Sequence, residues 1–336
     1  MPLPNNPPEL VCPAGTPAAF RVAIDAGADA VYCGFQNATN ARNFPGLNFT
    51  LEELEESIEY AHNRGKKTLL ALNTFPPAGQ TSLWKKAVAD GVKAGVDAMI
   101  VADIGVAQHI ASNYPEQRLH LSVQAGAPSV EAIRYYCEEF AVKRVVLPRI
   151  LSIPEITQLK NEIPCEIETF IFGNQGLMAE GRCSLTNFVS GISTNFDGAC
   201  SPPGDVTFYE DKNNVMYSKL GEFTIDCFSC SQGAGYPTIC KGKYVAPHRS
   251  DPYYAFEEPI SLNLFDLLPQ LIGAGIEAFK IEGRQRSRAY IKQVVSTWRT
   301  AIDNVMLGKP IQKADLIALT EGQKETTGAF RSKQWR

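Results

Sequence analysis

The chain has 336 residues, of which 44% are hydrophobic and 20% charged, as in an ordinary globular protein with enough apolar material for a large core. Its formal net charge of -4 argues against a protein that grips nucleic acid through many phosphates. We expect a cytoplasmic protein without a transmembrane segment, because no secretory signal opens the sequence and no apolar run approaches the roughly 18–20 residues that span a bilayer.

Short apolar strands alternate with helices from the first residues onward. A strand expected at 10–14 is followed by a helix over 17–26, and a second strand at 30–34 is followed by a long polar loop. Thr50 and Glu53 then form the sequence signature of a capping box, which predicts that the next helix begins there.

The same alternation continues along the chain. Further strands are expected at 68–73, 98–103, 119–124, 144–149, 166–173 and 279–282, and further helices near 82–94, 104–113, 129–139, 153–161, 261–274 and 287–306. Eight strands that alternate with helices predict an α/β fold, a (β/α)8 TIM-like barrel. A doubly wound sheet is the alternative, although no G-x-G-x-x-G fingerprint follows the first strand.

The cysteines are concentrated between the seventh and eighth expected strands. Five of the nine lie there, in a stretch rich in glycine, proline and asparagine that has no sustained period: Cys183, Cys200, Cys227, Cys230 and Cys240. Thiolates are soft ligands for iron–sulfur clusters or zinc, and a disulfide framework is not expected in a reducing compartment. Simple burial of the cysteines is the other interpretation, because their spacing matches no compact ferredoxin or zinc-finger pattern.

These elements divide the chain into four parts. Residues 1–173 supply the first seven barrel strands, and residues 174–258 form an irregular, cysteine-rich insertion after strand seven. Residues 259–308 supply the last barrel helix, strand and helix, and residues 309–336 form a C-terminal extension. The insertion would then lie at the C-terminal rim of the barrel, where barrel enzymes keep their active sites.

Polar side chains at the ends of the expected strands are the candidates for the barrel cavity. Some of them will be structural, because acids and bases inside a barrel often pair with one another. No catalytic residue is assigned, since the sequence contains no H-E-x-x-H, G-x-S-x-G or P-loop pattern. The candidates for substrate binding are Arg42, Asn73, Gln124, Arg149, Glu168, Glu282 and Arg284, with Cys33, Asp103 and Lys280 at neighbouring strand ends.

Several motifs occur in a specific order. Glu-Thr-Phe-Ile-Phe-Gly at 168–173 precedes Glu-Gly-Arg-Cys at 180–183, Gly-Ala-Cys-Ser-Pro follows at 198–202, and Lys-Ile-Glu-Gly-Arg-Gln-Arg-Ser follows at 280–287. With these motifs the chain resembles the collagenase-like peptidase family, and most closely its UbiU branch of anaerobic ubiquinone-biosynthesis proteins.

The resemblance implies an iron–sulfur protein that takes part in oxygen-independent ring hydroxylation during ubiquinone biosynthesis. It implies a ubiquinone precursor as substrate and a heterodimer with a UbiV-like subunit. It also implies a 4Fe-4S cluster, three of whose ligands correspond to Cys183, Cys200 and Cys240 in this sequence.

The fourth ligand is where this sequence departs from the family. Gly176 stands where the family has cysteine, and glycine cannot ligate iron. The neighbouring Asn174 and Gln175 also replace the small and apolar residues that are usual there. Either Cys227 or Cys230 replaces the missing thiolate, or the cluster has an open iron site, or the site holds zinc or no metal.

Other functions remain alternatives at this point. RNA-hydroxylating members of the same family also resemble this chain, although its acidic balance argues against RNA. Peptidase activity is a further alternative, for which the sequence offers no convincing nucleophile and base. A cluster-free scaffold or precursor-binding subunit is the alternative outside enzymes. We therefore expect a subunit of an oxygen-independent hydroxylase.

Overall fold

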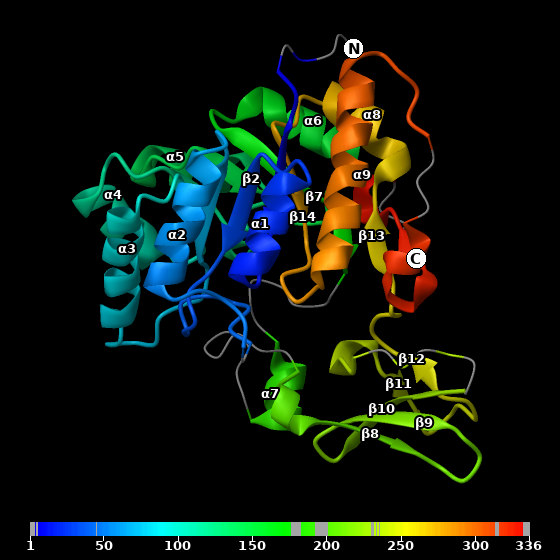
Figure 1. The fold of residues 1–336 in the computed structure, drawn as a ribbon. Coiled ribbons are helices and arrows are strands. Elements are labelled where there is room, and N and C mark those ends of the chain that lie inside the picture. Colours follow the sequence, from blue (N-terminus) through cyan, green and yellow to red (C-terminus); the bar gives the residue numbers. More distant parts are fainter. Residues whose placement is uncertain are drawn as a thin grey trace.

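The computed structural model describes residues 4, 6–44, 46–175, 183–191, 201–229, 232, 234, 236–312 and 316–331. Figure 1 shows a barrel of strands surrounded by helices, with a smaller lobe beneath it that belongs to the middle of the chain. No helix in the described ranges is long and apolar enough to cross a membrane.

Within the described residues, eight parallel strands close into a barrel. They are β1 (Glu9–Pro13), β2 (Ala30–Cys33), β3 (Lys67–Leu72), β4 (Ala98–Val101), β5 (Leu119–Leu121), β6 (Arg144–Val146), β7 (Glu166–Asn174) and β14 (Ala278–Ile281). Strands β1 to β7 pair in sequence order, and β14 pairs with both β1 and β7, which closes the ring. The predicted (β/α)8 barrel is therefore confirmed, with its long insertion after strand seven.

Helices follow most of the strands and cover the outside of the ring. They are α1 (Pro17–Asp25), α2 (Leu51–His62), α3 (Ser82–Ala94), α4 (Ile104–Asn113), α5 (Val130–Phe140), α6 (Ile153–Glu162), α8 (Leu268–Gly273) and α9 (Arg288–Met306). The predicted capping box is present at α2, where the Glu53 amide donates to the Thr50 hydroxyl and the Thr50 amide to the Glu53 carboxylate. Fully buried side chains such as Trp298 and Phe20 fill the layer between helices and strands.

The prediction of a helix over 261–274 is wrong for the first half of that range. That part forms β13 (Ser261–Asn263), which pairs antiparallel with the extended end of β7, and the short turn η4 (Phe265–Leu267). The Asn263 side chain accepts a hydrogen bond from the Phe265 amide at 3.1 Å and ends the strand. Pairing with β7 buries Leu262 completely, so tertiary contact decides the local structure here.

The insertion is less irregular than expected. It contains α7 (Ser184–Ser190), an antiparallel sheet of β8 (Val206–Glu210), β9 (Met216–Leu220) and β10 (Phe223–Phe228), the turn η3 (Ile239–Lys241), and the pair β11 (Lys243–Tyr244) and β12 (Tyr253–Tyr254). The signal that was missed is the turn between β8 and β9. There the Asp211 carboxylate accepts from the amides of Asn213 and Val215, and Asn214 adopts a positive φ of 58°.

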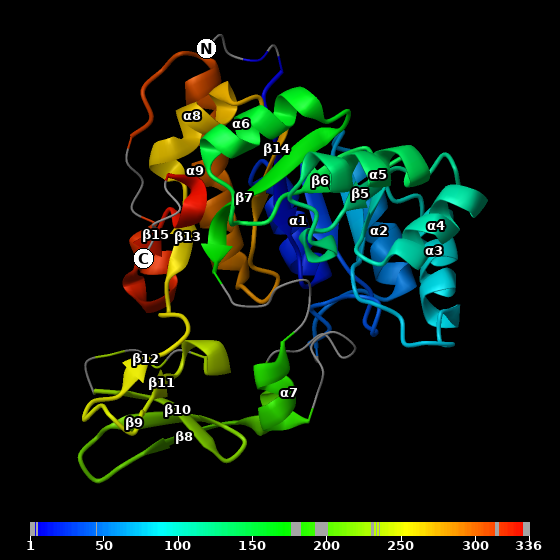
Figure 2. The same cartoon turned by 180° about the vertical axis from the view of Figure 1, so that it is seen from behind.

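The C-terminal segment returns to the barrel. Its strand β15 (Glu325–Thr326) pairs parallel with β13, and Figure 2 shows the two side by side. Leu316 and Phe330 are buried at its two ends. Residues 316–331 are therefore an ordered part of the fold.

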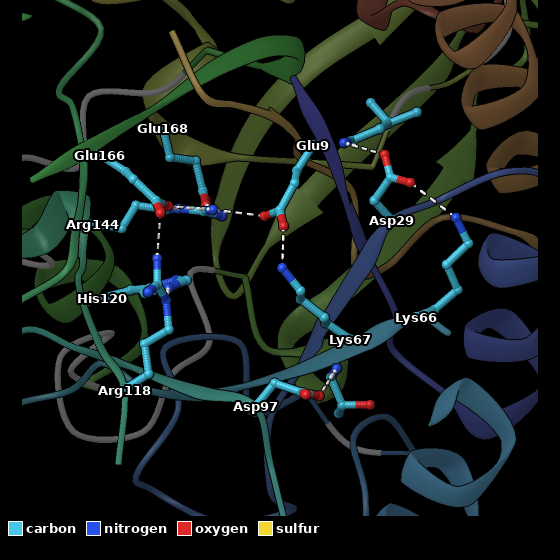
Figure 3. Close-up of polar contacts among 12 residues, drawn as sticks. Glu9, Asp29, Lys66, Lys67, Asp97, Arg118, His120, Arg144, Glu166 and Glu168 are labelled. Atoms are coloured by element: carbon cyan, nitrogen blue, oxygen red, sulfur yellow. Dashed lines mark hydrogen bonds and ion pairs between the residues drawn. The ribbon is translucent and has the colours of Figure 1, made fainter. Parts of the chain in front are cut away.

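A network of ion pairs links the N-terminal ends of the strands inside the barrel (Figure 3). The Arg144 guanidinium lies 2.6 Å from carboxylate oxygens of Glu9 and Glu166 and 3.4 Å from Glu168. The Lys280 ammonium lies 2.5 Å from the other oxygen of Glu168. Because Arg144, Glu168 and Lys280 are almost fully buried, each charge depends on its partners for stabilisation.

His120 lies beside this network and predicts a pH dependence of stability. Its side chain is buried, and burial together with Arg144 and Arg118 holds the pKa of the imidazole well below its usual value. Below about pH 6.5 the unfolded chain binds a proton there that the folded chain does not. The free energy of unfolding should therefore fall as the pH drops below this value, by up to about 1.4 kcal/mol per pH unit from this group.

Urea unfolding between pH 5 and 7.5 measures this slope. In His120→Gln, which keeps a hydrogen-bond acceptor for Arg118, the slope between pH 6.5 and 5 should be shallower than in the wild type. The exposed His248 lies outside the barrel network, and His248→Gln provides the control for the loss of one histidine. Equal slopes in the wild type and His120→Gln would contradict the expectation.

Candidate functional site

The residues predicted for the cavity divide between two levels of the barrel. Glu168 lies in the inner ion-pair network with Lys280 and Arg144, where it is fully buried. The other candidates for substrate binding lie at the C-terminal ends of the strands, at the opening next to the insertion: Arg42, Asn73, Gln124, Arg149, Glu282 and Arg284.

The loop between β2 and α2 supplies the centre of the cluster at the opening. Arg284 donates from Nη1 to Asn40 Oδ1 at 2.7 Å, and the amide of Arg42 donates to the same oxygen at 2.9 Å. Gly34 is required beneath this side chain, because a Cβ there would lie 2.6 Å from Asn40 Cγ. The buried Asn40 therefore joins the loop to the segment that follows β14.

Asn73 and Gln124 form a second part of the cluster. The Asn73 side chain accepts from the Ala41 amide at 3.0 Å and donates to the carbonyl oxygen of the Gln124 side chain. The Ser122 hydroxyl donates to the same Gln124 oxygen at 3.2 Å. These contacts bring the ends of β3 and β5 together at the opening, as the sequence predicted for their polar residues.

Glu282 is the acidic group of the opening. Its carboxylate lies 3.6 Å from Arg42 Nη2 and accepts from the Asn174 amide at 3.1 Å. Burial would raise the pKa of Glu282, but Arg42 and Arg149 outweigh it and hold the pKa below the usual value. This carboxylate is therefore ionised at neutral pH and suited to accept hydrogen bonds.

Arg149 has the geometry of a ligand-binding group. Its guanidinium lies 3.9 Å above the ring of Phe170, and its buried Nε has no hydrogen-bond partner among the described residues. Burial lowers the pKa of Arg149, and nearby Glu282 partly offsets this effect. With Arg42 and Arg284, it gives the opening three guanidinium groups around one carboxylate, which suits a ligand that carries negative charge or a polarised ring.

Two neighbouring candidates have structural roles. The Asp103 carboxylate caps α4 by accepting from the Val106 amide at 2.9 Å. Cys33 is fully buried, and burial raises the pKa of its thiol to about 12, so it is uncharged at neutral pH.

The insertion places two of the predicted metal ligands next to elements that pack together, α7 and η3. Tyr244 donates from its hydroxyl to the Ile239 carbonyl at 2.6 Å, beside the buried Cys240. Burial raises the pKa of Tyr244, and the nearby thiols of Cys240 and Cys183 raise it further. Cys240 lies in η3 and Cys183 directly precedes α7, and Ile239 of η3 packs in one apolar cluster with Leu185 of α7.

The other candidate ligands are placed differently. Cys227 is exposed on β10 opposite Tyr217, with Tyr254 also nearby. Cys200, Cys230 and Gly176 lie outside the described residues. Within the ranges that the structure describes, no three His, Cys, Asp or Glu side chains form a group that could hold a metal ion. Thiols are soft ligands of the kind that iron–sulfur clusters and zinc take, so the metal site stays a prediction.

A contact between the insertion and the barrel was missed by the sequence reasoning. The ammonium group of Lys241, the residue after Cys240, contacts the Asn174 side chain and the carboxylate of Glu321. Glu321 also lies 3.1 Å from Arg286, which follows β14. The position of Lys241 next to a candidate ligand was the only local signal for this contact. Its partners Asn174 and Glu321 are too distant in sequence to be predicted.

The sequence is similar to that of known proteins over most of its length. The model of peptidase family U32 matches residues 15–333. The chain is 30% identical over 332 residues to tRNA hydroxylation protein P of Escherichia coli, covering 94% of this chain and 72% of that protein. It is 32% identical over 302 residues to tRNA hydroxylation protein P1 of Bacillus subtilis, covering 88% and 63%.

A third relative has a related name. The chain is 27% identical over 325 residues to 23S rRNA 5-hydroxycytidine C2501 synthase of Escherichia coli, covering 94% of this chain and 42% of that protein. The family match extends over nearly the whole sequence, across the barrel, the insertion and the C-terminal segment. This protein belongs to peptidase family U32.

Proposed function

We propose that this protein is an iron–sulfur subunit of an oxygen-independent hydroxylase that acts on the ring of a ubiquinone precursor, in a heterodimer with a UbiV-like partner. The observation that carries the proposal is the packing of α7, which Cys183 precedes, against η3, which contains Cys240, in a lobe that is tied to the cation-rich opening of the barrel. Relatives in the family that are named for hydroxylation reactions support the reaction class.

A 4Fe-4S cluster would be held by Cys183, Cys200 and Cys240, the positions that match the family motif. The fourth ligand is Cys227, Cys230 or a group from outside the chain. When bound, the cluster supplies an electron-transfer or Lewis-acid site for a hydroxylation that does not use dioxygen. Zinc is the alternative metal, on the set Cys200, Cys227, Cys230 and Cys240.

The residues of the opening would bind and orient the ring. Arg149 presents a planar cation whose buried Nε has no hydrogen-bond partner among the described residues, and Arg42 adds a second positive charge. Glu282 stays ionised between them and accepts a hydrogen bond from a ring hydroxyl. The linked side-chain amides of Asn73 and Gln124 add further polar groups at the ends of β3 and β5. This arrangement fits a phenol or carboxyphenol better than an apolar ligand.

RNA is the second candidate substrate. It is favoured by the names of the relatives, which refer to tRNA and 23S rRNA. Against it stands the negative net charge of this chain. The chain spans 63–72% of the two tRNA hydroxylation proteins and 42% of the rRNA enzyme. The substrate therefore has to be decided by experiment.

The test is a deletion of the gene in its own host, grown without oxygen and analysed by mass spectrometry for both quinones and RNA nucleosides. We expect ubiquinone to be lost, its unhydroxylated precursor to accumulate, and the hydroxylated nucleosides to remain. Reintroducing the wild-type gene should restore ubiquinone. Normal ubiquinone with a missing hydroxylated nucleoside would replace the proposal by RNA hydroxylation, and no change in either class would contradict both.

A further inference from the structure

We infer that Glu321, in the C-terminal segment, is a positioning residue for the cysteine site: through the buried Lys241 it holds Cys240 in place beside the opening of the barrel. This inference deepens the proposed function and rests on it for the role of Cys240. The contacts themselves are independent of which substrate or metal is bound.

Lys241 is the link between the two parts. It directly follows Cys240 in the turn η3, and its side chain is only 5% exposed. Its ammonium contacts the Glu321 carboxylate and the Asn174 side chain. Since Lys241 and Cys240 are consecutive residues, a displacement of the lysine also displaces the cysteine.

Glu321 joins this lysine to the barrel. One carboxylate oxygen contacts Lys241, and the other lies 3.1 Å from Arg286, just after the barrel strand β14. Asn174 also joins Lys241 to the barrel: its side chain contacts Lys241, and its backbone amide donates to Glu282 at the barrel opening. A continuous polar path therefore runs from the residue next to Cys240 to the proposed substrate-binding residues.

Hydrogen bonding and close packing fix the position of Glu321 in the C-terminal segment. The Glu321 amide donates to the Ser261 hydroxyl at 2.9 Å, where β13 begins. The next residue, Gly322, has a φ of +59°, and a Cβ there would lie only 2.3 Å from the Pro259 carbonyl oxygen. Further along, the Gln175 amide is packed so closely that a Cβ on Gly328 would lie 2.9 Å from its nitrogen.

Asn174 and Gln175 gain a role from these contacts. They are the two residues beside Gly176 that depart from the family pattern. Asn174 binds Lys241, and the buried Gln175 packs against the C-terminal segment at Gly328. The altered loop of this chain is thus fitted to the segment that carries Glu321.

The charge balance explains why Glu321 should control the position of Cys240. A buried ammonium that loses its carboxylate partner is strongly unfavourable and moves toward water. In Glu321→Gln the amide keeps the size of the side chain but cannot neutralise Lys241. Lys241 should then turn outward, and the turn that carries Cys240 should open.

The experiment measures thiol alkylation in the full-length protein after removal of bound metal under reducing conditions. Isotope-coded iodoacetamide and mass spectrometry give a separate rate for each cysteine. We expect Glu321→Gln to accelerate the labelling of Cys240 at least about tenfold and to leave Cys165, which is buried in the barrel, unchanged. The charge-swapped double variant Lys241→Glu with Glu321→Lys should return the Cys240 rate toward the wild-type value.

Two results would overturn the inference. An unchanged Cys240 rate in Glu321→Gln would show that the contact does not position the cysteine. Equal acceleration of Cys240 and Cys165 would show general destabilisation of the fold rather than positioning. Because the readout needs neither substrate nor cluster, a failure here is distinct from a failure of the proposed hydroxylase function, which the deletion strain tests.

Discussion

Replacing Glu168 by alanine should lower the free energy of unfolding by roughly 3–5 kcal/mol, the usual cost of removing one partner of a buried ion pair. Glu168 is fully buried and neutralises both Lys280 and Arg144 inside the barrel. The variant leaves these cations with less negative charge nearby and also creates a cavity. Urea unfolding at pH 7 measures the change as a shift of the transition midpoint.

A matched exposed pair provides the control. Glu56 lies 3.8 Å from Arg21 on the helical surface, and both side chains are more than half exposed. Glu56→Ala should change the free energy of unfolding by no more than about 1 kcal/mol, because water screens such pairs. Glu168→Gln separates charge from volume, and it should remain strongly destabilised. If Glu168→Gln were as stable as the wild type, the ionic account of the barrel interior would be wrong.

The barrel could be predicted because its signals are local. Apolar runs locate the eight strands, and the Thr50 and Glu53 pair locates the start of α2. Glycines such as Gly95, which has a φ of 84° after α3, mark where helices end. Each of these signals acts within a few residues, so a single sequence is enough to read it.

The parts that were missed depend on contacts between distant residues. Pairing with β7 makes a strand of 261–263, where apolar spacing suggested a helix. From its position in a strand, Glu168 was predicted to line the cavity. Its carboxylate forms ion pairs with Arg144 and Lys280. No local pattern reveals which opposite charges will meet inside a closed ring.

The candidate site shows the same limit. The sequence indicated which polar residues end the strands, and several of them do meet at the opening through Asn40 and Asn73. It gave no sign that Glu321 would reach Lys241, because the C-terminal segment is polar and carries no motif. The clustering of these polar residues at one end of the barrel was thus predictable, whereas the connection between that end and the segment with Cys240 was not.

The cysteine site is expected to show the largest functional effect. Cys240→Ala removes a predicted cluster ligand from η3, and we expect it to abolish cluster binding. Cys137→Ala is the matched control, since Cys137 lies on α5 of the barrel, away from the insertion. Cys227→Ala and Cys230→Ala identify the fourth ligand, because only loss of a real ligand should release iron.

The most direct test is the iron, sulfide and zinc content of protein purified without oxygen, together with its visible spectrum. The account predicts about four irons per chain and absorption near roughly 400 nm, lost in Cys240→Ala and retained in Cys137→Ala. A wild-type protein that contains zinc or no metal, or an iron content that Cys240→Ala leaves unchanged, would contradict the proposal of an iron–sulfur hydroxylase subunit.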